Sequence, residues 1–211
     1  MNIITPKEAM LQSLHDACSF HLYKRTLDLT KNIAEDMDYQ KNFTNYYRVR
    51  RDDGWLQEFY KFFEENKNNK EITFEKKIRH LSNVEHKVKQ TSKNPTGKAK
   101  TVEASFASKM LATINPNHPI WDSQVLRCLN IKIDDTLDYD SKINKCIKVY
   151  HKIEEEISAF IATTEGKQCI ELFDATFPSC VDLSRHKKVD FYLWNLGKKS
   201  PSFADSSTGC N

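Results

Sequence analysis

Apolar side chains recur along most of the chain at the three- and four-residue spacing of an amphipathic helix. The clearest case is 140–160, whose inward positions are Ile143, Ile147, Tyr150, Ile153 and Ile157. The same period predicts further helices at 55–65, 73–86, 102–114, 168–173 and 183–196. No segment alternates in the two-residue pattern of a half-buried strand, so we predict an all-α fold.

Turn and cap residues separate these helices. Thr5-Pro6 is typical of a helix start, and helical character is expected to continue, with breaks, to about Ala34. Residues 39–51 are aromatic and basic with no clear period, and Asp52-Asp53-Gly54 is typical of a turn followed by a helix cap. The segment 87–100 contains Asn94-Pro95-Thr96-Gly97 and is predicted to be a loop.

The domain organisation follows from this pattern. We predict one helical domain at 1–197, with room for two lobes and an active segment at 102–129. The Ser-rich tail at 198–211 is expected to be disordered.

Composition narrows the class of protein. The 211 residues include only 5 Gly and 6 Pro, too few for the turns of an all-β chain. No apolar run approaches the roughly 20 residues of a membrane span. The first nine residues lack the pattern of a signal peptide, so we expect a cytoplasmic protein. We also expect it to be a monomer. The six cysteines show no Cys-x-x-Cys pair or zinc spacing, which predicts reduced thiols, no metal and no cofactor.

Basic residues are concentrated in one part of the chain although the net charge is only +3. The segment 87–100 carries five lysines: Lys87, Lys89, Lys93, Lys98 and Lys100. A flexible strap of this kind suits contacts with DNA phosphates, and the alternative is an ordinary solvated connection. Arg48, Arg50 and Arg51 form a second basic cluster.

The segment from Ser105 to Val125 carries the candidate chemistry. On a helical wheel, Lys109 lies at the edge of the apolar arc formed around Phe106 and Met110, so its amine can face a cleft. Asp122 follows a Pro-bounded break and opens the next helix, which brings it back towards Lys109. A lysine and a carboxylate in one cleft can act as nucleophile and proton-handling group. The alternatives are a surface lysine and a helix cap.

These residues resemble a motif of the helix–hairpin–helix DNA glycosylase superfamily, especially the bacterial 8-oxoguanine DNA glycosylase-like proteins. There, a Gly-x-Gly hairpin turn precedes a lysine, and a Pro-Val-Asp-type segment supplies an aspartate. Here Ser105-Phe106-Ala107-Ser108-Lys109 and Pro119-Ile120-Trp121-Asp122 take those places. The stretch from Lys188 to Trp194 looks like the C-terminal helix of these proteins.

The resemblance implies two helical lobes around a cleft that removes an oxidised purine from duplex DNA. It implies that Lys109 is the nucleophile, that Asp122 is the catalytic carboxylate, and that Ser105 contacts substrate. Trp121 is then a candidate to stack on the flipped base, or a core aromatic residue. His118 is a candidate for phosphate contact or proton transfer, or an exposed loop residue.

Two other functions stay open on the sequence. Because Ser105 and Ala107 replace both hairpin glycines, a non-catalytic helical DNA-binding module, in a defence or repair assembly, is the second interpretation. A helical protein–protein adaptor is the third. Its docking face would be an aromatic cluster, formed by Trp55, Phe59, Tyr60, Phe62 and Phe63.

Overall fold

The structure is mainly helical, as the apolar period predicts. The computed structural model describes residues 17–69, 71–134 and 136–199. In chain order its elements are α2 (Ala17–Leu27), α3 (Met37–Tyr47), α4 (Asp53–Asn66), α5 (Phe74–Asn83), β1 (His86–Lys87), β2 (Lys98–Ala99), α6 (Ala104–Ile114), α7 (Ser123–Cys128), α8 (Tyr139–Ala162), α9 (Thr164–Thr176), the short 3-10 turn η2 (Pro178–Cys180) and α10 (Arg185–Lys199). The helix start predicted at Thr5-Pro6 lies outside the described residues, and so does the predicted tail beyond Lys199.

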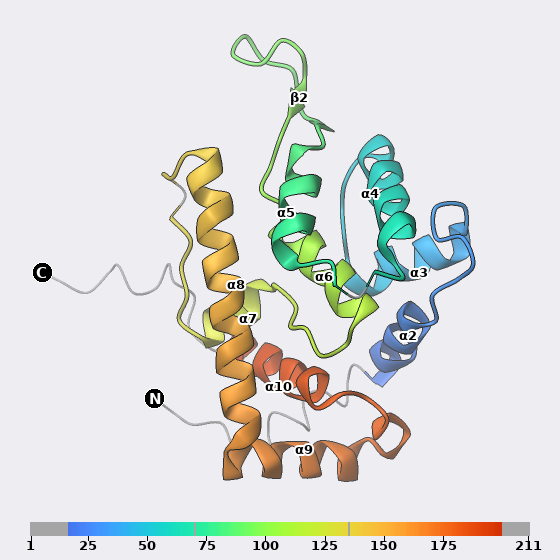
Figure 1. Ribbon diagram of the computed structural model, residues 1–211, viewed down its shortest axis with the longest axis vertical. Coiled ribbons are helices and arrows are strands. Elements are labelled where there is room, and N and C mark those ends of the chain that lie inside the picture. Colours follow the sequence, from blue (N-terminus) through green and yellow to red (C-terminus); the bar gives the residue numbers. More distant parts are fainter. Residues whose placement is uncertain (1–16, 70, 135, 200–211) are drawn as a thin grey trace, which may run out of the picture.

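The long helix α8 runs along one side of the molecule and links its two ends (Figure 1). It contacts α5 near one end and α9 and α10 near the other. The α10 helix packs most extensively against α7, while α5 packs against α6 and α2 packs against α3.

The hydrophobic core is formed by the faces that the helical period predicts. All five inward positions of α8 are buried, from Ile143 to Ile157. The aromatic cluster of α4 is buried as well, with Trp55, Phe59 and Phe63 each no more than 1% exposed. Burying an aromatic side chain of this size stabilises the fold by about 1.5–3 kcal/mol. The cluster is therefore part of the core and does not supply an exposed docking face for an adaptor.

Side-chain caps begin most of the described helices. Asp52 accepts a hydrogen bond from the backbone N–H of Trp55, as the turn at 52–54 predicts. Asp36 caps α3 in the same way, where the sequence showed no period. The α3 helix buries Tyr39, Asn42 and Phe43. The buried Asn42 interrupts the apolar pattern, because its amide donates to the Leu22 carbonyl oxygen at 3.1 Å.

The segment 87–100, predicted to be a loop, is mostly loop and turn, but two short strands bracket it. This segment forms a β-hairpin in which β1 and β2 pair antiparallel, with His86 opposite Ala99. Strands of two residues are too short to show an alternating pattern. The hairpin depends on local geometry instead: Gly97 has a φ of +61°, and its carbonyl oxygen accepts from the Val88 N–H at 2.9 Å.

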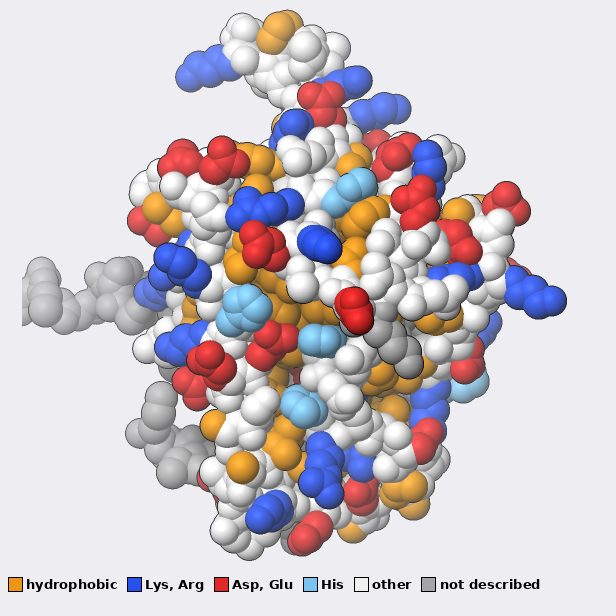
Figure 2. All heavy atoms as spheres, in the orientation of Figure 1, with side chains coloured by type: hydrophobic (Ala, Val, Ile, Leu, Met, Phe, Trp, Pro, Cys, Tyr) orange, Lys and Arg blue, Asp and Glu red, His pale blue; other side chains and the backbone are white. Residues whose placement is uncertain are grey.

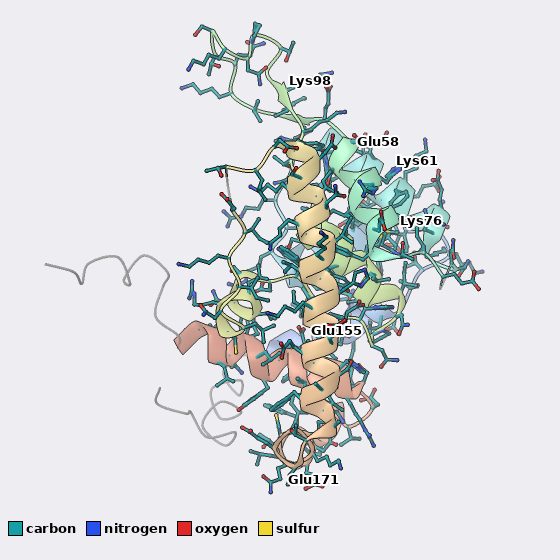
Figure 3. The ribbon with its side chains drawn as sticks, turned by 60° about the vertical axis from the view of Figure 1, so that its left-hand side comes forward. Glu58, Lys61, Lys76, Lys98, Glu155 and Glu171 are labelled. Carbon is teal, nitrogen blue, oxygen red and sulfur yellow. The ribbon has the colours of Figure 1, made fainter. Side chains whose placement is uncertain are left out.

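The hairpin projects beyond the rest of the molecule and is surrounded by solvent (Figures 1 and 2). Its base is tied to the body on both sides. Asp52 Oδ2 accepts from the Lys87 N–H at 2.9 Å, and the Arg51 guanidinium bonds to Glu103 Oε1 at 2.7 Å. Lys98 lies at this end of the molecule, and Glu171 lies at the opposite end (Figure 3). The five hairpin lysines are exposed.

Among the residues that the structure describes, no helix combines the length and apolar character required to cross a lipid bilayer.

Candidate functional site

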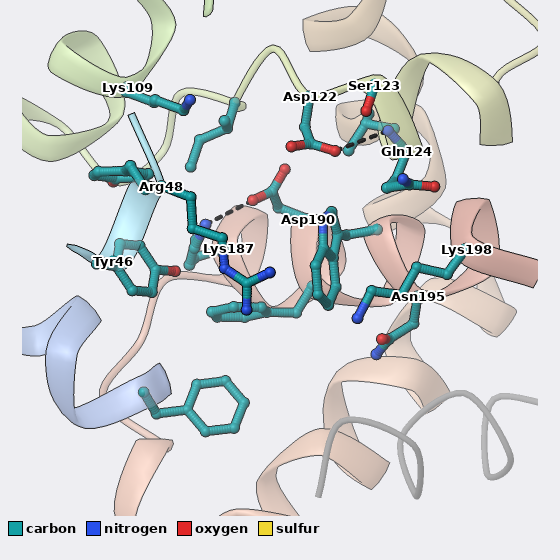
Figure 4. Close-up of a pocket in the computed structure, with 16 residues that line it drawn as sticks. Tyr46, Arg48, Lys109, Asp122, Ser123, Gln124, Lys187, Asp190, Asn195 and Lys198 are labelled. Atoms are coloured by element: carbon teal, nitrogen blue, oxygen red, sulfur yellow. Dashed lines mark hydrogen bonds and ion pairs between the residues drawn. The ribbon is translucent and has the colours of Figure 1, made fainter. Parts of the chain in front are cut away.

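A cavity of about 480 Å³ lies where the ends of several helices meet. Its walls come from α2, α3, α6, α7 and α10 (Figure 4). The residues that line it are Phe20, Tyr46, Tyr47, Arg48, Lys109, Ile120, Asp122, Ser123, Gln124, Val125, Lys187, Asp190, Phe191, Trp194, Asn195 and Lys198. Its volume lies in the range of about 300–1,000 Å³ that is usual for small-molecule sites.

Lys109 lies on the cavity side of α6. The adjoining face of this helix packs into the core through Phe106 and Met110, so Lys109 lies at the edge of the buried arc, as the helical wheel predicts. The Lys109 ammonium lies 5.8 Å from the ring centres of both Tyr47 and Phe106. Burial among these side chains lowers the pKa of Lys109 to about 8, although the carboxylates of Asp122 and Glu103 partly oppose the shift.

Asp122 lies at the start of α7 and serves as its cap. Its Oδ1 accepts from the Gln124 N–H at 2.8 Å. Burial raises the pKa of Asp122; the hydrogen bond from Gln124 opposes this rise, and the nearby carboxylate of Asp190 adds to it. Asp122 therefore caps α7 and lines the cavity at the same time.

The structure brings Lys109 and Asp122 to the same cavity. Each of the two side chains contributes to the pKa of the other, so their charges interact across it. The loop between α6 and α7 reverses the chain, as the Pro-bounded break predicts. Two buried hydrogen bonds fix this reversal: the Trp121 N–H donates to Ser108 Oγ at 2.8 Å, and the Tyr150 hydroxyl donates to the Pro119 carbonyl oxygen at 2.9 Å.

A second lysine–carboxylate pair forms the floor of the cavity, and the sequence did not reveal it. Lys187 Nζ lies 2.6 Å from Asp190 Oδ2, and both side chains are less than a tenth exposed. The other carboxylate oxygen, Asp190 Oδ1, is buried and has no hydrogen-bond partner among the described residues. In the close-up view the carboxylates of Asp190 and Asp122 face one another (Figure 4). An unpaired buried oxygen is costly, so this group is suited to accept a hydrogen bond from a ligand.

Arg48 reaches into the cavity from the end of α3 (Figure 4). It adopts a left-handed backbone conformation with a φ of 49°, which is uncommon for a residue other than glycine. With Lys109, Lys187 and Lys198 it gives the cavity four cationic groups against the two carboxylates. Tyr46 and Trp194 add aromatic surface. The site is therefore positively charged with apolar walls.

The other predicted site residues lie away from this cavity lining. Trp121 is 9% exposed and packs in the core. His118 bonds to Glu154 on α8. Ser105 is half-buried in the first turn of α6, and Ala107 lies inside that helix. The connection before α6 is not a short hairpin turn at these positions but the longer segment 84–103, which carries the lysines.

The described residues contain no group of three or more His, Cys, Asp or Glu placed to hold a metal ion. Comparison of the chain with protein-family models, with curated proteins and with solved structures gave no match.

Proposed function

We propose that this protein is a DNA glycosylase with lyase activity that removes an oxidised purine from duplex DNA. The observation that carries the proposal is that Lys109 and Asp122 line one cavity and influence each other's pKa. The resemblance of their sequence segments to glycosylase motifs supports the same reaction class.

Lys109 is the proposed nucleophile. Because burial lowers its pKa to about 8, part of the population carries a free amine near neutral pH. This amine attacks C1′ of the deoxyribose, the bond from C1′ to the base breaks, and the base leaves with a proton. Opening of the sugar ring at O4′ then gives an imine between C1′ and Nζ. Loss of the C2′ proton and of the 3′ phosphate cleaves the strand by β-elimination.

Asp122 is the proposed carboxylate of the reaction. When ionised, it stabilises the positive charge that develops on the sugar as the base departs. Its raised pKa also makes it a better proton carrier at neutral pH than an exposed aspartate. The hydrogen bond from the Gln124 N–H holds one oxygen in place, which keeps the group oriented before substrate arrives.

The cavity and the hairpin suit the two parts of such a substrate. Aromatic walls and the free oxygen of Asp190 fit a flat heterocycle with N–H groups that has been flipped out of the duplex. The hairpin lysines provide positive charge for the phosphate backbone outside the cavity.

Borohydride trapping tests the proposal directly. We expect the protein to form a covalent adduct with duplex DNA that contains an abasic site or 8-oxoguanine, and peptide mapping should find the adduct at Lys109. Lys109→Gln should abolish trapping. Lys61→Gln, the same change on the exposed surface of α4, should leave trapping intact. A wild-type protein that binds these duplexes but neither forms an adduct nor releases a base contradicts the enzyme proposal.

A non-catalytic DNA-binding module is the second candidate. The observation that favours it is the exposed lysine hairpin, which stands in place of a short Gly-rich turn. This function predicts salt-dependent duplex binding with no adduct, so the same trapping experiment distinguishes the two.

A further inference from the structure

Two histidines and a glutamate form a cluster behind the loop that leads to Asp122. One carboxylate oxygen of Glu154, on α8, is hydrogen-bonded to His118 Nδ1 at 2.8 Å. The other is hydrogen-bonded to His151 Nδ1 at 3.0 Å. Histidine side chains gather on this face of the molecule in the space-filling view (Figure 2). His118 and Glu154 are each about 30% exposed, so solvent protons reach the pair.

The loop from Asn115 to Trp121 is held by side chains from three other segments. Ser184, which directly precedes α10, donates through Oγ to the Pro116 carbonyl oxygen at 2.6 Å. On α8, the Tyr150 hydroxyl bonds to the Pro119 carbonyl oxygen, and on α6, Ser108 bonds to the Trp121 N–H. These three contacts join neutral groups.

The contact between His118 and Glu154 differs from the other three because both partners can carry charge. A hydrogen bond between ionised groups is roughly twice as strong as a neutral one. Burial would raise the pKa of Glu154, but the hydrogen bonds from His118 and His151 outweigh burial and lower it. Glu154 is therefore an anion across the pH range in which histidine titrates, about 5 to 8.

We propose that the His118–Glu154 pair positions Asp122, so that protonation of His118 tightens the loop that presents this carboxylate to the cavity. The proposal rests on the function proposed above and adds a pH-dependent positioning residue to it. The titratable groups that face His118 are Glu154 and His151 from α8 and His186 from α10.

Single-turnover release of 8-oxoguanine from duplex DNA, measured from pH 5 to 8, is the first arm of the test. His118→Asn keeps an N–H donor for Glu154 but does not titrate. We expect its rate to be about a tenth of the wild-type rate at pH 5.5 and to approach the wild-type rate at pH 8. A merely structural role would lower the rate by the same factor at every pH. A ratio that does not change with pH overturns the proposal.

Glu154→Gln removes the charge that attracts His118. We expect base release to fall by about tenfold at pH 6, whereas borohydride trapping of abasic DNA stays within twofold, because Lys109 is on α6 and not on the loop. His151→Asn is the matched control: it makes the same non-titrating change at the other hydrogen-bond partner of Glu154, on α8 rather than on the loop, and should leave both assays within twofold. An equal effect of the two variants on base release also overturns the proposal.

Hydrogen exchange at the Gln124 amide measures positioning without any turnover, because this N–H bonds to Asp122 Oδ1. We expect exchange to be about tenfold faster in Glu154→Gln than in wild type at pH 6, and unchanged in His151→Asn. If the wild-type protein neither traps DNA nor releases base, the proposed function fails, and the exchange rates still decide whether the pair positions Asp122. If base is released but Gln124 exchanges equally fast in both proteins, the positioning proposal alone fails.

Discussion

The pH dependence of imine formation by Lys109 is the sharpest quantitative consequence of the cavity. With a pKa of about 8, roughly a quarter of Lys109 is free amine at pH 7.5, against roughly a thousandth of an unperturbed lysine. Since only the neutral amine attacks the sugar, the initial trapping rate on abasic DNA should rise about tenfold per pH unit below 8 and level off above it.

Two substitutions should move the midpoint of this pH profile in opposite directions. The Asp122 carboxylate favours the charged form of Lys109, so Asp122→Asn should shift the midpoint to lower pH. The Arg51 guanidinium disfavours that form, and its loss also releases Glu103, so Arg51→Gln should shift the midpoint to higher pH. The signs follow from the charges alone, whatever the size of each shift.

The assay is the initial rate of borohydride-trapped adduct between pH 6 and 10, with Lys109→Gln subtracted to remove spontaneous reaction of the abasic sugar. A profile that keeps rising without levelling until pH 10 or beyond would mean that Lys109 is a solvated lysine. Shifts of the same sign in both variants would contradict the electrostatic argument even if the wild-type midpoint were near 8.

The remaining predictions concern stability, binding and the catalytic carboxylate. Lys77 is fully buried and its Nζ donates to the Ile72 carbonyl oxygen at 3.0 Å; burial lowers its pKa to about 7. Because the unfolded chain holds this proton up to a higher pH, wild-type stability should rise between pH 7 and 10. Lys77→Met should flatten that rise and add about 1–3 kcal/mol at pH 6 in urea unfolding. Replacing three hairpin lysines with Gln (Lys89, Lys93 and Lys98) should weaken DNA binding. The slope of log K against log salt concentration should become shallower by up to about 3. An unchanged slope would show that the DNA-binding surface lies elsewhere. Asp122→Asn should slow base release by roughly 100-fold but change the melting temperature little, because Asn keeps the capping oxygen.

Much of the fold was predictable because the apolar period and the caps are local signals. The inward face of α8 and the capping role of Asp52 could be identified from neighbouring residues alone. The convergence of Lys109 and Asp122 was also predictable, since a helix, a Pro-bounded reversal and a capped helix fix their approximate relation. The hydrogen bonds that lock the reversal, from Tyr150 and Ser108, depend on tertiary packing.

The floor of the cavity could not be predicted for a different reason. Lys187 and Asp190 are charged residues three apart on a helix, a pattern that is far more common on an exposed surface. They are buried by tertiary packing, with α7 against α10 and the Tyr23 ring of α2 against Lys187. The positive φ of Arg48 could not be predicted from the sequence either, because glycine or asparagine is the usual residue at such a position.

The attachment of the β-hairpin has a consequence for how this protein can change. Asp52 and Arg51 fasten both legs at the base, while the tip extends into solvent. Residues beyond the base can therefore be lengthened, shortened or exchanged at little cost to folding, since loop closure entropy grows slowly with loop length. The length and charge of the hairpin can therefore change between related proteins while the helices that hold Lys109 and Asp122 keep their structure.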